Sequence, residues 1–176
     1  MLIIVKVSLH QPLLPGEQVK IKLLYQVKIP TDKFTRFGYD DQGNFKLKYW
    51  YITPGVYDGS WQVYSDKNLG NQYTPPANIS IKLSTRPHLY VSSSLDLKNT
   101  VTDNGYKTFY LSGEDIVNSQ IYLTRSNIME VYDLNSRLVI TNLDDGGLMV
   151  GMKGLILNRI LKFLETRLGT YPHKQL

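Results

Sequence analysis

The chain has 176 residues, of which 42% are hydrophobic and 20% charged, with no cysteine and a formal net charge of +5. This length suits one domain of ordinary size, and the composition supplies enough apolar residues for a core, which excludes a wholly disordered chain. The absence of cysteine excludes disulfides, thiol catalysis and thiolate metal sites. It fits a cytosolic protein and a bacterial envelope protein equally well.

The positive charge does not indicate a nucleic-acid partner, because lysine and arginine are scattered along the chain rather than gathered on one segment. No apolar run approaches about 20 residues, the length of a membrane-spanning helix. We therefore expect neither a nucleic-acid partner nor a membrane span. The first residues lack the features of a signal peptide and are typical of a strand, so we expect the first strands of the domain to lie upstream of Met1.

The chain begins with a predicted hairpin. Residues 2–9 are apolar and β-branched, and residues 11–17 form a connection with two prolines and a Pro-Gly pair. Residues 19–29 then alternate between apolar and polar side chains, which is the period of a long strand with one solvent-exposed face. Pro30 ends this strand.

The middle of the chain consists of short strand-like segments separated by turns at residues 40–44 and 103–105. We predict strands at residues 45–51, 61–64, 79–83, 89–95, 106–111, 120–124, 130–132 and 137–141. Many short strands separated by turns are typical of antiparallel architectures. The sequence therefore predicts a mainly β fold, an antiparallel sandwich or saddle-like domain, with one C-terminal α-helix.

The period becomes helical from about residue 149 to residue 168, after a loop at residues 144–147. Gly169 fits a C-terminal cap, and Pro172 prevents the helix from resuming. One broad apolar stripe contains Met152, Leu155, Ile156, Ile160, Phe163, Leu164 and Leu168. We divide the chain into a β domain at residues 1–145, lacking its first strands, and a terminal helix with a junction at residues 146–176.

The chain carries no recognisable catalytic motif. A zinc peptidase needs H-E-x-x-H, which aims two imidazoles at one metal and places a glutamate to activate the bound water. The histidines are His10, His88 and His173, and none has a Glu-x-x-His partner. A site assembled from these three by folding is an alternative to three surface or loop histidines. We predict no catalytic, cofactor-binding or metal-ligating residue in this chain.

Two acidic segments suggest sites but favour turns. Asp144 and Asp145 could act as paired carboxylates, yet the two glycines that follow favour a solvated turn. Residues 40–44 faintly resemble a calcium loop but lack its alternating ligand spacing and terminal glutamate. We expect a hairpin turn there as well.

Aromatic residues gather in one stretch and are the only candidate ligand contacts. They are Tyr49, Trp50, Tyr51, Tyr57 and Trp61. Exposed rings on a sheet could stack on sugars, whereas buried rings would anchor the core. The second interpretation is favoured.

Three segments, in order, resemble the N-terminal domain of the aminopeptidase N family of zinc metallopeptidases (gluzincins), in its divergent bacterial form. Residues 12–17 read Pro-Leu-Leu-Pro-Gly-Glu before the long alternating segment, as in that domain's hairpin. Residues 50–61, from Trp-Tyr to Val-Tyr-Asp-Gly-Ser-Trp, are similar to an aromatic stretch of the bacterial members. Residues 164–172 end in Leu-Gly-Thr-Tyr-Pro, similar to the motif that leads into the catalytic domain.

The resemblance implies a non-catalytic β domain that braces the catalytic domain of the same polypeptide and forms one wall of its cleft. That hydrolase domain, with H-E-x-x-H and zinc, would lie beyond Leu176 and act on a peptide substrate in the bacterial cytoplasm or cell envelope. The family's usual substrate-binding segment, with its glutamine and cysteine, is replaced here by residues 50–61. We therefore assign no substrate-binding residue by resemblance.

Two other functions remain open. A stand-alone β-sandwich module could bind carbohydrate or peptide through its surface aromatics, which requires exposed, coplanar rings. An unrelated hydrolase would require His10, His88 or His173 to converge with Asp or Glu in one pocket. The supporting-domain hypothesis instead expects an exposed apolar face on the terminal helix.

Overall fold

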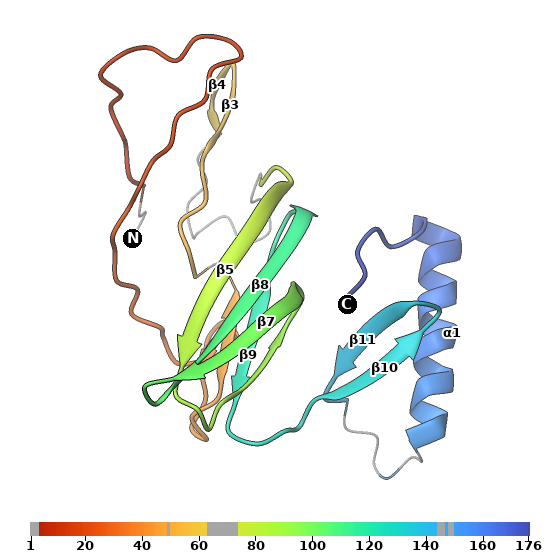
Figure 1. Ribbon diagram of the computed structural model, residues 1–176. Coiled ribbons are helices and arrows are strands. Elements are labelled where there is room, and N and C mark those ends of the chain that lie inside the picture. The colour runs from red at the N-terminus through yellow and green to blue at the C-terminus, as the bar shows by residue number, and fades with distance from the viewer. Residues whose placement is uncertain (1–3, 49, 63–73, 144–146, 148–149) are drawn as a thin grey trace.

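A computed structural model of the protein describes residues 4–48, 50–62, 74–143, 147 and 150–176 (Figure 1). Within these residues the fold is mainly β, with eleven strands in antiparallel sheets and one C-terminal helix. The predicted fold class is confirmed. The candidate Tyr49, the pair Asp144 and Asp145, and the predicted strand end at residues 63–64 lie outside the described residues.

The first sheet has four strands in the order β1-β2-β9-β6. They are β1 (Gly38–Tyr39), β2 (Phe45–Lys48), β6 (Tyr90–Ser93) and β9 (Gln120–Thr124). All three pairings are antiparallel. The turn between β1 and β2 is the one expected at residues 40–44, and the predicted bounds of β9 are confirmed.

The second sheet has three antiparallel strands in the order β5-β8-β7. They are β5 (Ala77–Thr85), β7 (Asp96–Asp103) and β8 (Tyr106–Ile116). Asn104 and Gly105 connect β7 to β8 with φ angles of 48° and 76°, the left-handed conformation of a two-residue hairpin turn. The turn predicted at residues 103–105 is therefore confirmed.

The two sheets pack face to face around one hydrophobic core. Leu47 and Ile121 enter it from the first sheet, and Phe109 and Leu111 enter it from β8 of the second. Leu95 lies in the link between the sheets and is 1% exposed. Burying such a side chain fully stabilises the fold by about 1.5–3 kcal/mol. The architecture is therefore the expected antiparallel sandwich.

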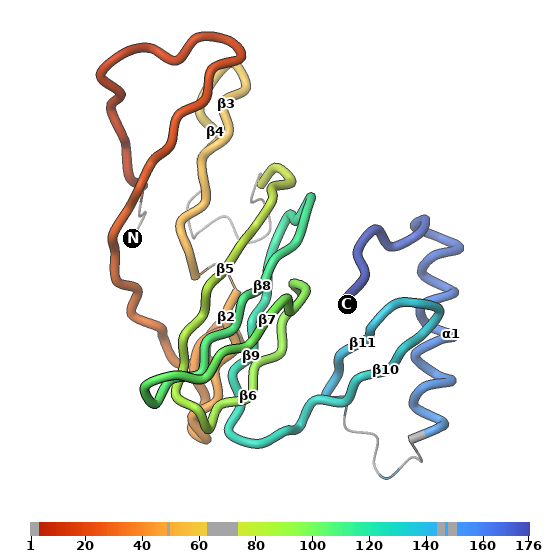
Figure 2. The backbone as a smooth tube through the Cα atoms, in the orientation of Figure 1, coloured from red at the N-terminus to blue at the C-terminus, as the bar shows by residue number. Residues whose placement is uncertain are grey.

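Two hairpins lie outside the sandwich. The first joins β3 (Val56–Asp58) to β4 (Ser60–Gln62), and the second joins β10 (Glu130–Leu134) to β11 (Arg137–Thr141). The second hairpin is followed by helix α1 (Val150–Leu168), which lies beside it in Figure 2. No described helix is long and apolar enough to cross a membrane.

Helix α1 occupies almost the residues predicted for it and ends as expected. Gly169 has a φ of 91°, and its N–H donates to the carbonyl of Glu165 at 3.0 Å. A glycine tolerates this left-handed angle because it has no Cβ. The predicted cap at Gly169 is confirmed.

The strands of the predicted N-terminal hairpin are wrong in the described part of the chain, whereas its connection does form a turn, in which the N–H of Glu17 donates to the carbonyl of Leu14 at 3.0 Å. Residues 4–29 contain no strand, and residues 4–28 are exposed throughout. They rise away from the sandwich as an extended arm, the red segment of Figure 1, beside β3 and β4. Two physical reasons explain why the arm forms no hairpin. Pairing its two halves would bring Lys6 against a face that carries Lys20, Lys22 and Lys28. In addition, an isolated two-stranded hairpin is only marginally stable in water.

Candidate functional site

The C-terminal part of the chain forms a small unit of β10, β11, α1 and a terminal tail. The N–H of Leu138 donates to the carbonyl of Lys174 at 2.9 Å, and the N–H of Leu176 donates back to the carbonyl of Leu138 at 2.8 Å. Ile140 donates to the carbonyl of Leu176 at 2.9 Å. The tail thus lies along β11 in parallel orientation and extends the hairpin by one strand-like segment.

The face of α1 that packs on this hairpin is partly polar. It consists of residues four apart, namely Lys153, Leu157, Leu161 and Glu165. Residues at this spacing share one side of a helix. Leu161 is 5% exposed and Lys153 is 8% exposed, and the Glu165 carboxylate forms an ion pair with Arg137 of β11. Two ion pairs between α1 and the β10–β11 hairpin therefore take the place of some of the apolar contacts expected between a helix and a sheet.

The Lys153 ion pair is the better defined of the two. Its Nζ donates to Oε1 of Glu130 at 2.9 Å and to Oε2 at 3.0 Å, and the hydroxyl of Tyr132 donates to Oε2 at 2.7 Å. The hydrogen bond from Lys153, and then that from Tyr132, holds the pKa of Glu130 below its ordinary value of 4.5. The same bond to Glu130 raises the pKa of Tyr132 above 10.0.

A glycine allows the close approach of helix and hairpin. A Cβ added at Gly154 would lie 3.4 Å from Cδ1 of Tyr132, which is at the tight end of ordinary contact. The ring of Tyr132 thus packs directly on the backbone of α1. The helix and β10 are held together at this point by ring contact as well as by charge.

The apolar stripe predicted on α1 divides between two surroundings. Ile160, Leu164 and Leu168 line a hollow with Val139 of β11 and the tail. Met152, Ile156 and Phe163 recur every three or four residues on the side turned away from the hairpin, and Ile160 lies at the edge of that side. The exposed fractions of Met152, Ile156, Ile160 and Phe163 are 49, 38, 49 and 60%, large values for side chains of this kind. These four residues thus form a continuous exposed apolar surface, which we call the outer stripe of α1.

The apolar hollow has a volume of about 250 Å³ and continues this surface between α1 and the tail. Its lining includes Leu161, Leu164, Leu168, Tyr171 and Leu176. Burial raises the pKa of the Tyr171 hydroxyl above its ordinary value of 10.0. The hollow is open and hydrophobic, so it suits an apolar side chain of a neighbour rather than a charged ligand.

The tail also ties the C-terminal unit to the sandwich. The side-chain amide of Gln175 donates to the backbone carbonyls of Ser93 and Leu95, at the end of β6 and just beyond it. A polar cavity of about 360 Å³ lies beside this contact, lined by groups of both signs that include Asp96, Lys98, Glu114, His173 and Lys174. The mixture of charges gives it no preference for an anion or a cation.

His173 lines the polar cavity together with Asp96 and Glu114, whereas His10 and His88 are not among its lining residues. In the described part of the chain, no group of three or more histidine, cysteine or acidic residues could hold a metal ion. His10 lies in the exposed arm, His88 lies in the turn after β5, and the ring of His173 stands 5.4 Å from that of Tyr171. The hydrolase alternative thus has one histidine and two acidic residues at a common cavity, without a second histidine beside them.

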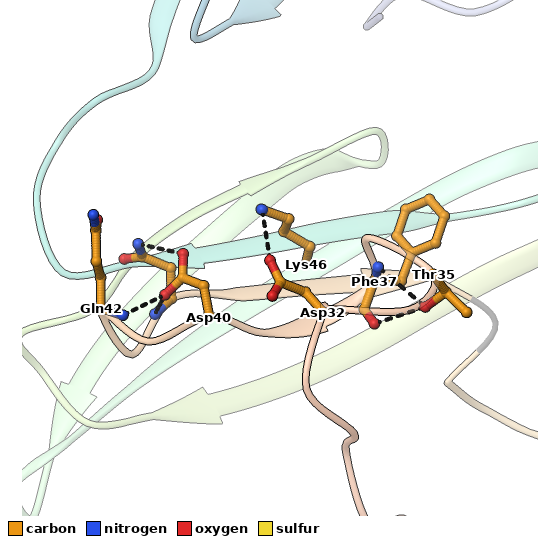
Figure 3. Close-up of polar contacts among 7 residues, drawn as sticks. Asp32, Thr35, Phe37, Asp40, Gln42 and Lys46 are labelled. Carbon is orange, nitrogen blue, oxygen red and sulfur yellow. Dashed lines mark hydrogen bonds and ion pairs between the residues drawn. The ribbon is translucent and has the colours of Figure 1, made fainter.

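The turn at residues 40–44 uses its acidic group locally. The Asp40 carboxylate accepts the N–H groups of Gln42 and Asn44 at 3.0 and 2.8 Å, as well as the side-chain amide of Asn44 (Figure 3). Burial alone would raise the pKa of Asp40, but these hydrogen bonds together lower it below 3.8. Nearby, Lys46 pairs with Asp32 at 3.0 Å. Asp40 therefore shapes the turn, as the hairpin interpretation expects.

The candidate aromatics separate into two environments. Trp50 packs against the core, with its indole N–H buried and unpartnered among the described residues, and the hydroxyl of Tyr51 bonds to Ser119 at 3.1 Å. Tyr57 and Trp61 face each other across the β3–β4 hairpin and are 64 and 66% exposed. Their rings meet at 70°, so they do not form one flat platform.

Sequence reasoning missed the polar face of α1. Glu130 and Arg137 were placed on predicted strands without partners, and Lys153 was not singled out. The signal was available, because Lys153, Leu157, Leu161 and Glu165 repeat every four residues beside the apolar stripe. A helix that has such a row of residues beside its apolar stripe can contact two different neighbours, one on each face.

Comparison with known proteins gave no match among protein-family models, curated proteins or solved structures.

Proposed function

We propose that this chain is the non-catalytic N-terminal β domain of a zinc aminopeptidase-like protein, and that it braces the catalytic domain of the same polypeptide. The observation that carries the proposal is the exposed outer stripe of α1, formed by Met152, Ile156, Ile160 and Phe163. A helix normally turns its apolar stripe toward a packing partner. Here the contact with β10 and β11 uses the other face, so the outer stripe is free to meet a second domain.

The sequence motifs indicate what that second domain is. The segment at residues 164–172 resembles the motif that leads into the catalytic domain of zinc aminopeptidases, and it includes the end of α1 itself. A catalytic domain that follows it would be well placed to cover the outer stripe. Zinc and the peptide-cleaving groups would belong to that domain, while this chain would form one wall of the substrate cleft.

The test uses the product of the whole gene rather than this chain alone. We expect the purified product to contain an H-E-x-x-H helix and about one zinc per chain, and to release 4-nitroaniline from an aminoacyl-4-nitroanilide. Treatment with a chelator should abolish the release, and added zinc should restore it. A gene product without that motif, or one whose zinc-loaded form cleaves no aminoacyl substrate, would refute the proposal.

A second candidate function is a stand-alone binding module. The exposed rings of Tyr57 and Trp61 favour it, since each ring offers one open face for a sugar or an apolar peptide side chain. Trp61→Ala should then abolish retention on an immobilised glycan or peptide that retains the unaltered chain. Under the supporting-domain proposal, Trp61→Ala in the product of the whole gene changes neither its zinc content nor its chelator-sensitive cleavage of the aminoacyl substrate.

A further inference from the structure

The second half of the arm, residues 19–29, has the form of a strand but no partner strand. Its apolar side chains alternate along the segment, and Val19, Ile21, Leu23 and Val27 are 47, 50, 42 and 47% exposed. No backbone hydrogen bond joins residues 19–29 to the rest of the described chain. An extended segment with open N–H and carbonyl groups is a template for an added strand.

This segment is held in place at two points. At its end, Ile29 packs against the hydrophobic core, and the carbonyl of Pro30 accepts the N–H of Tyr39 in β1 at 2.9 Å. Further along the arm, the hydroxyl of Tyr25 accepts the N–H of Ile52 at 3.4 Å. The segment therefore continues from the β1 edge of the sandwich with its direction fixed, which lowers the entropy lost when a second strand joins it.

All charged side chains on the opposite face of the segment are positive, and Leu24 and Gln26 complete that face. Lys20, Lys22 and Lys28 lie on it, and none of them forms an ion pair within the described chain. Like charges directly across two strands destabilise the pair, and opposite charges stabilise it. A second copy paired antiparallel about Leu24 would set Lys20 against Lys28, and residues 4–9 would add Lys6. The charge pattern thus favours an acidic partner over a second copy.

We propose that residues 19–29 are an acceptor strand for a partner protein. The occupant is an extended segment that alternates apolar and acidic side chains and adds to the open edge by β-strand pairing. Neighbouring strands keep their two faces aligned, so its apolar side chains lie beside Ile21 and Leu23, and its carboxylates lie beside Lys20 and Lys22. This interaction is independent of the function of the α1 outer stripe.

The test uses the full chain and a synthetic ten-residue peptide of alternating valine and glutamate. A matched peptide has lysine in place of glutamate, and a second control has the same composition as the first without alternation. We expect the glutamate peptide to bind at least about tenfold more tightly than the lysine peptide. We also expect amide hydrogen exchange to slow within residues 19–29. Equal affinity for the two alternating peptides, or protection confined to other segments, would overturn the proposal.

Charge reversal of the acceptor gives the sharper control. The triple variant Lys20→Glu, Lys22→Glu and Lys28→Glu should prefer the lysine peptide. A variant with the same net charge, Lys82→Glu, Lys98→Glu and Lys162→Glu, changes exposed lysines outside the arm and should retain the preference for glutamate. If both triple variants behave alike, the effect is one of net charge and the acceptor strand is refuted. If residues 19–29 become protected from amide hydrogen exchange when only the protein concentration is raised, a second copy is the occupant. That result would also refute the proposal of an acidic partner protein.

Discussion

The ammonium group of Lys153 on α1 lies 2.9 Å from Oε1 and 3.0 Å from Oε2 of Glu130 on β10. Lys153 is almost fully buried in this contact, although lysine is among the residues least often buried. The pair therefore fixes the packed face of α1, and that orientation leaves the apolar outer stripe exposed.

We first predict that the two partners of this pair are coupled. Glu130→Gln removes the carboxylate and leaves the buried ammonium of Lys153 without its acid, so the melting temperature should fall. The double variant Glu130→Gln with Lys153→Met also removes the buried charge and should recover part of the loss. Thermal unfolding followed by circular dichroism measures the double variant and each of the two single variants. Losses that simply add in the double variant would show that the two residues do not stabilise each other.

The pH dependence of stability provides a second prediction. The pKa of Glu130 lies below its ordinary value of 4.5 in the folded chain, so its ionised form stabilises the fold. That contribution is complete above about pH 4.5 and is lost as the pH falls through the lower, folded-state pKa. Urea midpoints of the unaltered chain and of Glu130→Gln should therefore differ at pH 7 and converge in acid. A constant difference from pH 7 into acid would contradict this assignment.

A third prediction concerns close packing at Gly113 in β8. A Cβ at this position would lie 2.7 Å from Cγ1 of Ile116 and 3.0 Å from Cδ2 of Leu95. Gly113→Ala should overpack the core and lower the free energy of unfolding by about 1–3 kcal/mol. The control is Gly151→Ala, since a Cβ there meets nothing within 4 Å and alanine favours helix by up to about 1 kcal/mol. Equal effects of the two changes, measured by urea denaturation, would refute the packing described for Gly113.

The fourth prediction contrasts the core with the arm. Ile121 is 0% exposed, so Ile121→Ala should cost about 2–5 kcal/mol through lost burial and a residual cavity. Leu24 in the arm is 101% exposed, and Leu24→Ala should change stability by less than about 0.5 kcal/mol. Urea denaturation of the two variants tests whether the arm is solvated in the isolated chain. A large loss for Leu24→Ala would show that the arm is packed.

The two tryptophans offer a fifth prediction by fluorescence. Trp50 packs against the core and Trp61 is 66% exposed. With Trp50→Phe, the remaining emission should be red-shifted and readily quenched by acrylamide. With Trp61→Phe, it should be blue-shifted and resistant to the quencher. The reverse pattern would contradict the environments described for the candidate aromatics.

The sequence was sufficient to predict the sandwich where burial and periodicity agree. Residues 120–124 and 137–141 alternate or run apolar between turn residues, and both form strands with the predicted bounds. The prediction missed β7, because it is an edge strand with mostly polar, exposed residues and a bulge beside Leu97. Such a strand is specified by its pairing with β8 rather than by its own pattern.

The arm illustrates the opposite error. Residues 19–29 have the clearest alternation in the chain, yet they form no strand because no neighbouring strand completes the hydrogen bonds. Alternation of apolar and polar residues shows that one face of a segment is apolar, but it does not show which neighbour covers that face. The same holds for α1, whose helical bounds were predictable but whose packed face depends on the charges of Glu130 and Arg137.

The most direct test of the central claim is chemical labelling at the outer stripe of α1. The chain has no cysteine, so Phe163→Cys introduces a single reactive thiol in it, and Lys162→Cys provides an exposed control on the same helix. Iodoacetamide labelling of the peptide that contains each site is followed by mass spectrometry, in the isolated chain and in the whole gene product. The supporting-domain account predicts that the Phe163→Cys variant is labelled fast in the isolated chain and much more slowly in the whole gene product. It predicts that the Lys162→Cys variant is labelled at similar rates in both proteins. Equal labelling of the Phe163 variant in the two proteins would contradict it.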